Sequence, residues 1–257
     1  MIYPNFFYEF DSGLQFFMDA VSKVSYTTAC DIKEGFRAST GTRQSLASSR
    51  MPTETIDCVF TNTNYSTELE SYLDYIKGKS VIFGDGSRRL ASYVKVVSAT
   101  EAIVPGDDTN KHVTMEIQFL GAVRGRLRAA LDLTAPAFVN DEGAAGGVAT
   151  QITALWSGAY FGIWKNFLLP EGNYTIFARA RDTVHVAKDL ILAVRDETAG
   201  SAVMTYSKTV AAGYGYYFAD FTLTSAQNGH NLLMQAVKGI NTPNNIYVDM
   251  LGFVAKP

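Results

Sequence analysis

The sequence predicts a mainly β protein, with an N-terminal antiparallel β domain carrying one packed helix and a C-terminal β-sandwich of the jelly-roll type. Three observations predict this fold class. Glycine, tyrosine and phenylalanine number 21, 14 and 16 among 257 residues, a composition that favours strands and turns. One segment of the first half has the start, stripe and stop of a helix. After residue 147, short strand patterns recur between turns without any helical stripe.

The helix is predicted within residues 65–78. Thr67 and Glu70 have the spacing of a capping box, in which a hydroxyl and a carboxylate satisfy main-chain N–H groups at a helix start. Gly78 stands where a helix C-cap glycine is expected. An apolar stripe at i, i+3, i+4 and i+7 comprises Leu69, Tyr72, Leu73 and Ile76.

The rest of the N-terminal domain, residues 1–126, reads as strands around this helix. Residues 55–60 form one expected strand. Residues 81–83 and 90–97 form two more around a Gly-Asp-Gly turn, and residues 112–120 alternate as a half-buried strand. Residues 27–52 are polar and small, and we expect either a protruding arm or long hairpin ordered against another subunit, or a surface loop.

The C-terminal domain is predicted to span residues 127–257. Alanine, glycine and proline become frequent through residues 135–147, which is typical of a linker or an opening loop. Strand patterns then follow at turn-spaced intervals, and this spacing predicts a sandwich. The expected strands are 159–164, 172–181, 190–194, 202–208, 216–224, 231–236 and 245–254. In the strand at 172–181 the alternation predicts an inward set of Tyr174, Ile176 and Ala178 or its register mate.

Composition and charge exclude several classes of function. The net charge of −3, without a long basic run, argues against nucleic acid as the main partner. Cys30 and Cys58 could pair, but two buried thiols fit better. The N-terminal residues show no signal peptide and no segment reaches membrane-spanning length, so we expect synthesis in a host cytoplasm without export or membrane insertion.

Catalytic patterns are absent from the sequence, so we predict that the protein is not an enzyme. His112, His185 and His230 are far apart and belong to no metal-binding or nucleophile motif. Acidic pairs such as Asp107 and Asp108 lie in turns, where solvation explains them. A glycosidase would need two carboxylates facing each other across a cleft, which sequence spacing does not reveal.

Aromatic residues are the better candidates for a binding site. Flat exposed rings beside polar donors hold sugars by stacking on the apolar face of the sugar ring. The alternative is burial in the sandwich core, where tryptophan is commonly found. The candidate glycan-binding residues are Trp156, Trp164, Tyr214, Tyr217 and Asn244.

The second domain resembles the galactose-binding-like jelly rolls used as carbohydrate-binding modules. The likeness lies in residues 169–182 (LPEGNYTIFARARD), 218–224 (FADFTLT) and 244–257 (NNIYVDMLGFVAKP). The resemblance implies a structural calcium ion at Asp249 as the one candidate cofactor. The second carboxylate of that family has no clear counterpart, although Asp141 and Glu142 are near the domain start.

The first domain resembles the N-terminal domain of bacteriophage distal tail proteins. The likeness lies in the order of an aromatic start, a polar arm, a strand, the helix ELESYLDYIKG and a DGSRR turn between strands. The resemblance implies a virion protein of the tail tip: a homohexameric baseplate ring that joins the tail tube to tip proteins, with an outer domain suited to host attachment through cell-surface polysaccharide. The alternatives are a stand-alone carbohydrate-binding protein and an unrecognised glycan-active hydrolase.

Overall fold

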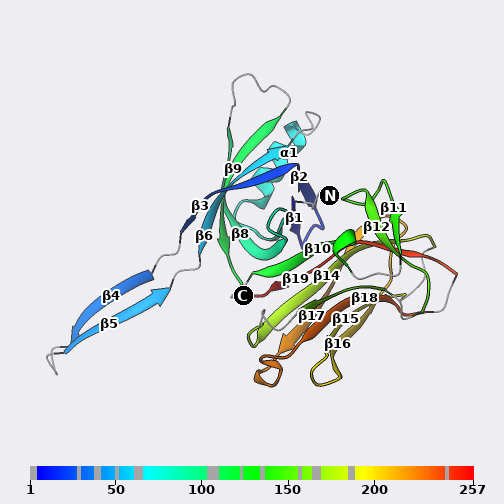
Figure 1. Ribbon diagram of the computed structural model, residues 1–257. Coiled ribbons are helices and arrows are strands. Elements are labelled where there is room, and N and C mark those ends of the chain that lie inside the picture. Colours follow the sequence, from blue (N-terminus) through cyan, green and yellow to red (C-terminus); the bar gives the residue numbers. More distant parts are fainter. Residues whose placement is uncertain are drawn as a thin grey trace. The chain divides into compact units, whose positions relative to one another are not determined.

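The computed structural model confirms a mainly β protein. It describes residues 5–27, 30–37, 42–49, 52–60, 66–102, 110–121, 124–133, 137–155, 158–163, 169–184, 189–240 and 243–257 (Figure 1). Among these residues there is one α-helix, and one isolated parallel bridge joins Lys77 to Val96.

The chain forms two compact units. The helix unit comprises Phe7–Val81 and Val94–Leu120, and the sandwich unit comprises Met1–Phe6, Ile82–Tyr93 and Gly121–Pro257. Strands β7 (Ser80–Asp85) and β8 (Leu90–Ala102) contribute residues to both units. The division expected at residues 126 and 127 stays a prediction.

The helix unit contains an antiparallel sheet in the order β3 (Ala20–Thr27), β6 (Thr53–Phe60), β9 (Lys111–Phe119) and the second half of β8. Alternate residues of β6 and β9 are buried, because successive side chains of a strand point to opposite faces. One face is therefore apolar and the other is partly exposed. The buried residues include Ile56, Cys58, Val94, Val96, Met115 and Ile117.

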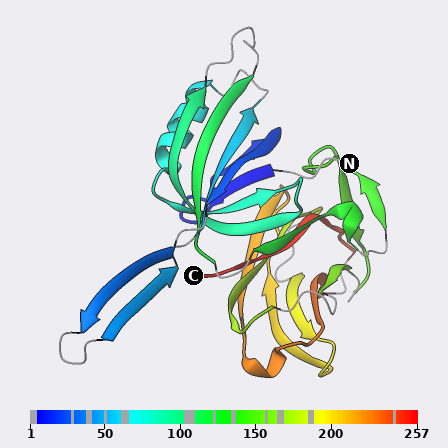
Figure 2. The same cartoon turned by 60° about the vertical axis from the view of Figure 1, so that its left-hand side comes forward.

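Helix α1 (Ser66–Ile76) lies alongside this sheet (Figure 2). All four residues of its predicted stripe are buried, and the Tyr72 ring stacks on Phe16 of β2 (Gln15–Met18) with centroids 4.2 Å apart. Gly78 has φ +77°, the left-handed conformation expected of a helix C-cap glycine. The Thr67 side chain of the predicted capping box lies outside the described residues.

Strands β4 (Cys30–Arg37) and β5 (Thr42–Ser49) form the predicted hairpin rather than a structureless loop. They pair along eight positions, from Cys30 with Ser49 to Arg37 with Thr42, and make a two-stranded sheet of their own (Figure 1). Of the two cysteines, Cys58 is a buried thiol, and the Cys30 side chain lies outside the described residues.

The sandwich unit consists of two facing antiparallel sheets. In the first sheet, β14 (Gly172–Asp182) lies between β17 (Gly215–Leu223) and β19 (Ile246–Ala255). The other edge of β19 pairs with β12 (Val148–Ile152) and β10 (Gly125–Ala129), and β12 pairs with β11 (Phe138–Asn140). The second sheet has the order β13 (Gly158–Ile163), β18 (Leu232–Lys238), β15 (Leu190–Asp196) and β16 (Ser201–Lys208).

The main core fills the space between these sheets. Tyr174, Ile176 and Ala178 of β14 point into it, as predicted from their alternation. They meet apolar residues of the second sheet such as Leu192 and Met234. Each buried side chain of this size contributes roughly 1.5–3 kcal/mol of transfer free energy, so this core stabilises the unit.

The opposite face of the first sheet is also covered in part. Phe177 of β14 points to this face and meets the Phe6 ring of β1 (Asn5–Glu9) edge-on, with centroids 6.4 Å apart. The Phe6 ring lies so close to Gly84 that a Cβ there would be 2.1 Å from a ring carbon. Further along β14, the same face carries Arg179 and Arg181, which belong to a polar network.

Candidate functional site

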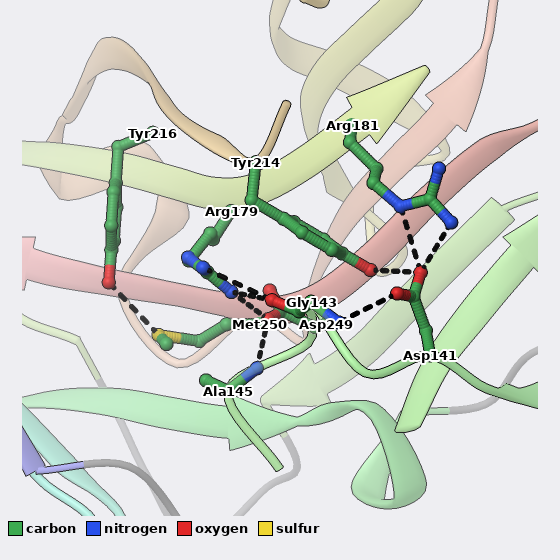
Figure 3. A network of polar contacts seen from close by, with 9 residues as sticks. All are labelled: Asp141, Gly143, Ala145, Arg179, Arg181, Tyr214, Tyr216, Asp249 and Met250. Carbon is green, nitrogen blue, oxygen red and sulfur yellow. Dashed lines mark hydrogen bonds and ion pairs between the residues drawn. The ribbon is translucent and has the colours of Figure 1, made fainter. Parts of the chain in front are cut away.

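Tyr214 lies at the centre of a polar network on the outer face of the first sheet (Figure 3). Arg179 and Arg181 reach this face because they are two residues apart on β14. Asp141 accepts hydrogen bonds on one oxygen, Oδ2, from Arg181 Nε at 2.8 Å and from the Tyr214 hydroxyl at 2.9 Å. The loop of residues 141–147 is thereby bound to the sheet.

Aromatic rings and guanidinium groups alternate in this network. Arg179 Cζ lies 4.5 Å from the ring centroid of Tyr214. Arg181 Cζ lies 5.6 Å from the Tyr214 centroid and 4.1 Å from the Tyr247 centroid. A guanidinium group within about 6 Å of a ring is attracted by the ring's quadrupole. Both arginines are therefore held in position by the rings as well as by carboxylates.

A buried ion pair forms the floor of the site. Arg179 Nη1 donates to Asp249 Oδ2, and the same carboxylate oxygen accepts the N–H of Ala145 at 2.8 Å. The Asp249 side chain is fully buried, and that of Arg179 is 10% exposed. Removing either charge alone would leave the other buried without a counter-ion.

Burial and charge shift several pKa values here. Burial raises the pKa of Asp249 to about 6, although the charge of Arg179 acts in the opposite direction. Burial also acts to raise the pKa of Asp141, but hydrogen bonds from Arg181 and Tyr214 outweigh it and lower that pKa. The pKa of Tyr214 is raised, mainly by burial and secondly by the charge of Asp249, so its hydroxyl stays a donor at neutral pH.

The network therefore holds a loop on the sheet and presents polar groups at its rim. Arg181 is the more exposed of the two arginines, with 27% of its side chain accessible. It lies between two half-buried tyrosine rings. A sugar bound here would meet guanidinium N–H groups and ring edges, because the faces of Tyr214 and Tyr247 are turned towards arginine.

Two further candidate residues lie elsewhere in the sandwich unit. Tyr217 packs against the main core, and its hydroxyl accepts the N–H of Ala211 at 2.7 Å. Asn244 is buried, and its Nδ2 donates to both oxygens of Asp182 at 2.8 Å and to Asp189 at 2.7 Å. Burial, together with the neighbouring Asp182, raises the pKa of Asp189 to about 6.

The remaining candidates are placed as follows. Trp156 and Trp164 lie outside the described residues, so their glycan-binding role stays a prediction. Asp249 and Asp141 both face arginines, and a calcium ion at Asp249 would have to displace Arg179. Among the residues that the structure describes, no group of three or more His, Cys, Asp or Glu side chains is placed to bind a metal.

The sequence pointed to Tyr214 as a glycan-binding candidate and the resemblance implied calcium at Asp249, but neither revealed the arginines that join these two residues. The signal was available in the Ala-Arg-Ala-Arg pattern of β14, since charged residues at i and i+2 share one face of a strand. The pairing of Arg181 with Asp141, 40 positions earlier in the chain, has no local pattern.

No helix in the described part of the chain is long and apolar enough to cross a membrane.

Two kinds of solved structure are similar to this chain. A family 35 carbohydrate-binding module from Clostridium thermocellum has 16% identity and a TM-score of 0.38, covering 51% of this chain and 98% of its own. A CBM36 domain of a xylanase from the hindgut metagenome of Trinervitermes trinervoides has 10% identity and a TM-score of 0.37, covering 50% and 95%.

The second kind is the Dit protein of phage SPP1, described as a hub adsorption apparatus. It has 13% identity and a TM-score of 0.33, and the match covers 97% of this chain and 99% of that protein. No family model and no curated protein matches the sequence. At these identities and scores, the likenesses assign no function to this chain.

Proposed function

We propose that this protein is a non-enzymatic structural component of a phage or phage-like tail tip, in which copies of the helix unit close a hexameric ring and the sandwich unit contacts host glycans. The observation that carries the proposal is the exposed edge of β3. Of the strands that the structure describes, β3 pairs with β6 alone, and seven of its eight residues are exposed.

An edge strand of this kind offers main-chain N–H and C=O groups to a neighbouring chain. Val24 is an extra residue in β3, because the register with β6 shifts between Lys23 and Ser25, and its side chain is 57% exposed. Such a bulge limits indiscriminate pairing of an edge, so it favours a partner that fits its geometry. A heterologous contact repeated by rotation closes a ring.

The β4–β5 hairpin supports the same proposal. Its strands pair only with each other within the described part of the chain, so both outer edges of the ribbon have no strand beside them. A two-stranded ribbon is marginally stable alone in water. Contact with a neighbouring subunit would stabilise it, as expected of an assembly arm.

Exposed apolar side chains on the helix unit also support the proposal. Single exposed apolar residues are normal, but several on one small unit favour a protein partner. The large apolar residues exposed on this unit are Leu14, Phe17, Val24, Tyr26 and Val97.

The first test is the mass of the purified protein by light scattering, with negative-stain images of the same sample. We expect a six-fold ring. Val24→Lys places a charge on the edge and should prevent the ring. Val184→Lys is the matched control, because Val184 is 61% exposed but belongs to the sandwich unit. A protein that stays monomeric at high concentration and with purified tail tube would contradict the proposal.

Glycan binding by the sandwich unit is the second part of the proposal. Arg181, partly exposed between Tyr214 and Tyr247, supports it, because a planar guanidinium group beside aromatic rings can donate hydrogen bonds to sugar hydroxyl or carboxylate groups. Glycan arrays probed with Trp156→Ala, Trp164→Ala and Tyr214→Ala variants test it. A monomer that binds sugar would instead favour the stand-alone carbohydrate-binding protein.

A further inference from the structure

A group of arginines in the sandwich unit lies apart from the Tyr214 network. Arg126 and Arg128 occupy alternate positions of β10 and therefore share one face of that strand. Arg89 ends the turn between β7 and β8, beside Leu90, which pairs with Arg126. Its main-chain oxygen accepts the N–H of Leu127 at 3.0 Å, so β10 holds the turn in place. These three residues form what we call the arginine cluster.

Two head groups of the arginine cluster converge on a single carboxylate oxygen. Arg89 Nη1 and Arg128 Nη1 lie 3.5 and 3.6 Å from the same atom, Asp132 Oδ2. Burial raises the pKa of Asp132, which weakens its hold on a negative charge. One partly desolvated carboxylate thus serves two guanidinium groups.

Repulsion within the arginine cluster is a cost to the folded chain. The pKa of Arg128 is lowered, mainly by burial and secondly by the charges of Arg126 and Arg89. The Nε atom of Arg128 is buried and has no hydrogen-bond acceptor. Buried donors are nearly always satisfied in folded proteins, so this one indicates a missing acceptor.

Arg89 adds a second cost, in its backbone. It is the one non-glycine residue with a positive φ, +54°, among the described residues. A long side chain is uncommon in that conformation, which glycine or asparagine adopts more readily. The neighbouring Arg88 is different, because Asp85 neutralises it within the turn. Features that oppose stability are expected where a chain binds something.

We infer that the arginine cluster binds phosphodiester groups of a cell-surface polymer. Guanidinium groups pair with phosphate through two parallel hydrogen bonds. Because its two non-bridging oxygens diverge from a tetrahedral phosphorus, a phosphodiester group can face guanidinium groups from more directions than a planar carboxylate can. It can therefore satisfy several arginines at once and supply the acceptor that Arg128 Nε lacks. The choice of a cell-surface source rests on the proposed function, whereas the phosphate chemistry does not.

The test is titration calorimetry of the full chain with a synthetic glycerol-phosphate decamer. We expect salt-sensitive binding that weakens about tenfold in Arg128→Gln and in Arg89→Gly. Arg195→Gln is the control, because Arg195 is a half-exposed arginine of the same unit, paired with Glu197 at 3.4 Å. No binding, or equal loss in the control, would overturn the inference.

Two further measurements separate binding from folding and from other polyanions. The Arg89→Gly variant should unfold at the same temperature as wild type or at a higher one, since glycine removes both the backbone cost and one repelling charge. A variant that is less stable but binds normally would show that Arg89 has a purely structural role. Equal affinity for polygalacturonate, a polycarboxylate, would refute phosphate selectivity, and tighter binding of a 20-base-pair DNA duplex would replace the cell-surface partner with nucleic acid. The mass of each sample is measured in parallel, so a monomer that binds phosphate refutes only the ring.

Discussion

Replacing Arg179 with methionine should destabilise the sandwich unit strongly. The substitution keeps an apolar stem of similar length but removes the counter-ion of Asp249, whose side chain is fully buried. Breaking a buried ion pair from one side costs about 3–5 kcal/mol of unfolding free energy. Loss of the contact with the Tyr214 ring adds about 0.5–1 kcal/mol.

The expected shift in melting temperature follows from this free energy. A loss of about 3–5 kcal/mol lowers the melting temperature by about 6–20 °C for a unit of this size class. Urea unfolding followed by tryptophan fluorescence reports the loss, because both tryptophans belong to residues 127–257. The loss of unfolding free energy should be smaller at pH 5 than at pH 8, since at pH 5 the unpaired Asp249 of the variant can be protonated and so carry no buried charge.

Two variants complete the test of the buried pair. Arg179→Met combined with Asp249→Leu should recover most of the lost free energy, because no buried charge remains. Arg195→Met removes an exposed arginine and should cost less than about 1 kcal/mol. If Arg179→Met alone costs no more than this control, or if the double variant is worse than the single one, the reasoning about the buried pair fails.

Three further substitutions test other contacts. Burial acts to raise the pKa of Glu9, but hydrogen bonds from Ser12, Tyr75 and main-chain N–H groups outweigh it and lower this pKa to about 2. The charge of Glu9 therefore stabilises the fold above the unfolded-state pKa, and this contribution is lost as the pH falls through about 2. Glu9→Gln should therefore cost about 1–3 kcal/mol at pH 7 and less at pH 2–3, measured by denaturant titration; a pH-independent difference would contradict this. Gly84→Ala should cost at least about 1–3 kcal/mol through its clash with Phe6, and an unchanged melting temperature would show that the ring can move. Val24→Lys should leave the melting temperature of the monomer within about 2 °C of wild type, because the site is exposed, and a larger drop would show that Val24 supports the fold.

The sequence by itself determined the fold class and the positions of many elements. The predicted helical stripe matches α1, which ends at Ile76 before the left-handed Gly78. The strand predicted at residues 172–181 is β14, Gly172–Asp182, with the predicted alternate residues in the core. These features follow from local rules: the period of apolar residues, the end signals of a helix and the alternation of a strand.

Only the tertiary structure decided which polar groups meet. Asp249 is 70 positions from Arg179 in the chain, and Asp132 meets Arg89 across 43 positions. Such pairs depend on strand register and on the direction in which each side chain leaves its sheet, and neither is encoded by spacing along the chain. For the same reason, the resemblance implied Asp249 as a calcium ligand but gave no sign of the guanidinium group that the fold places against it.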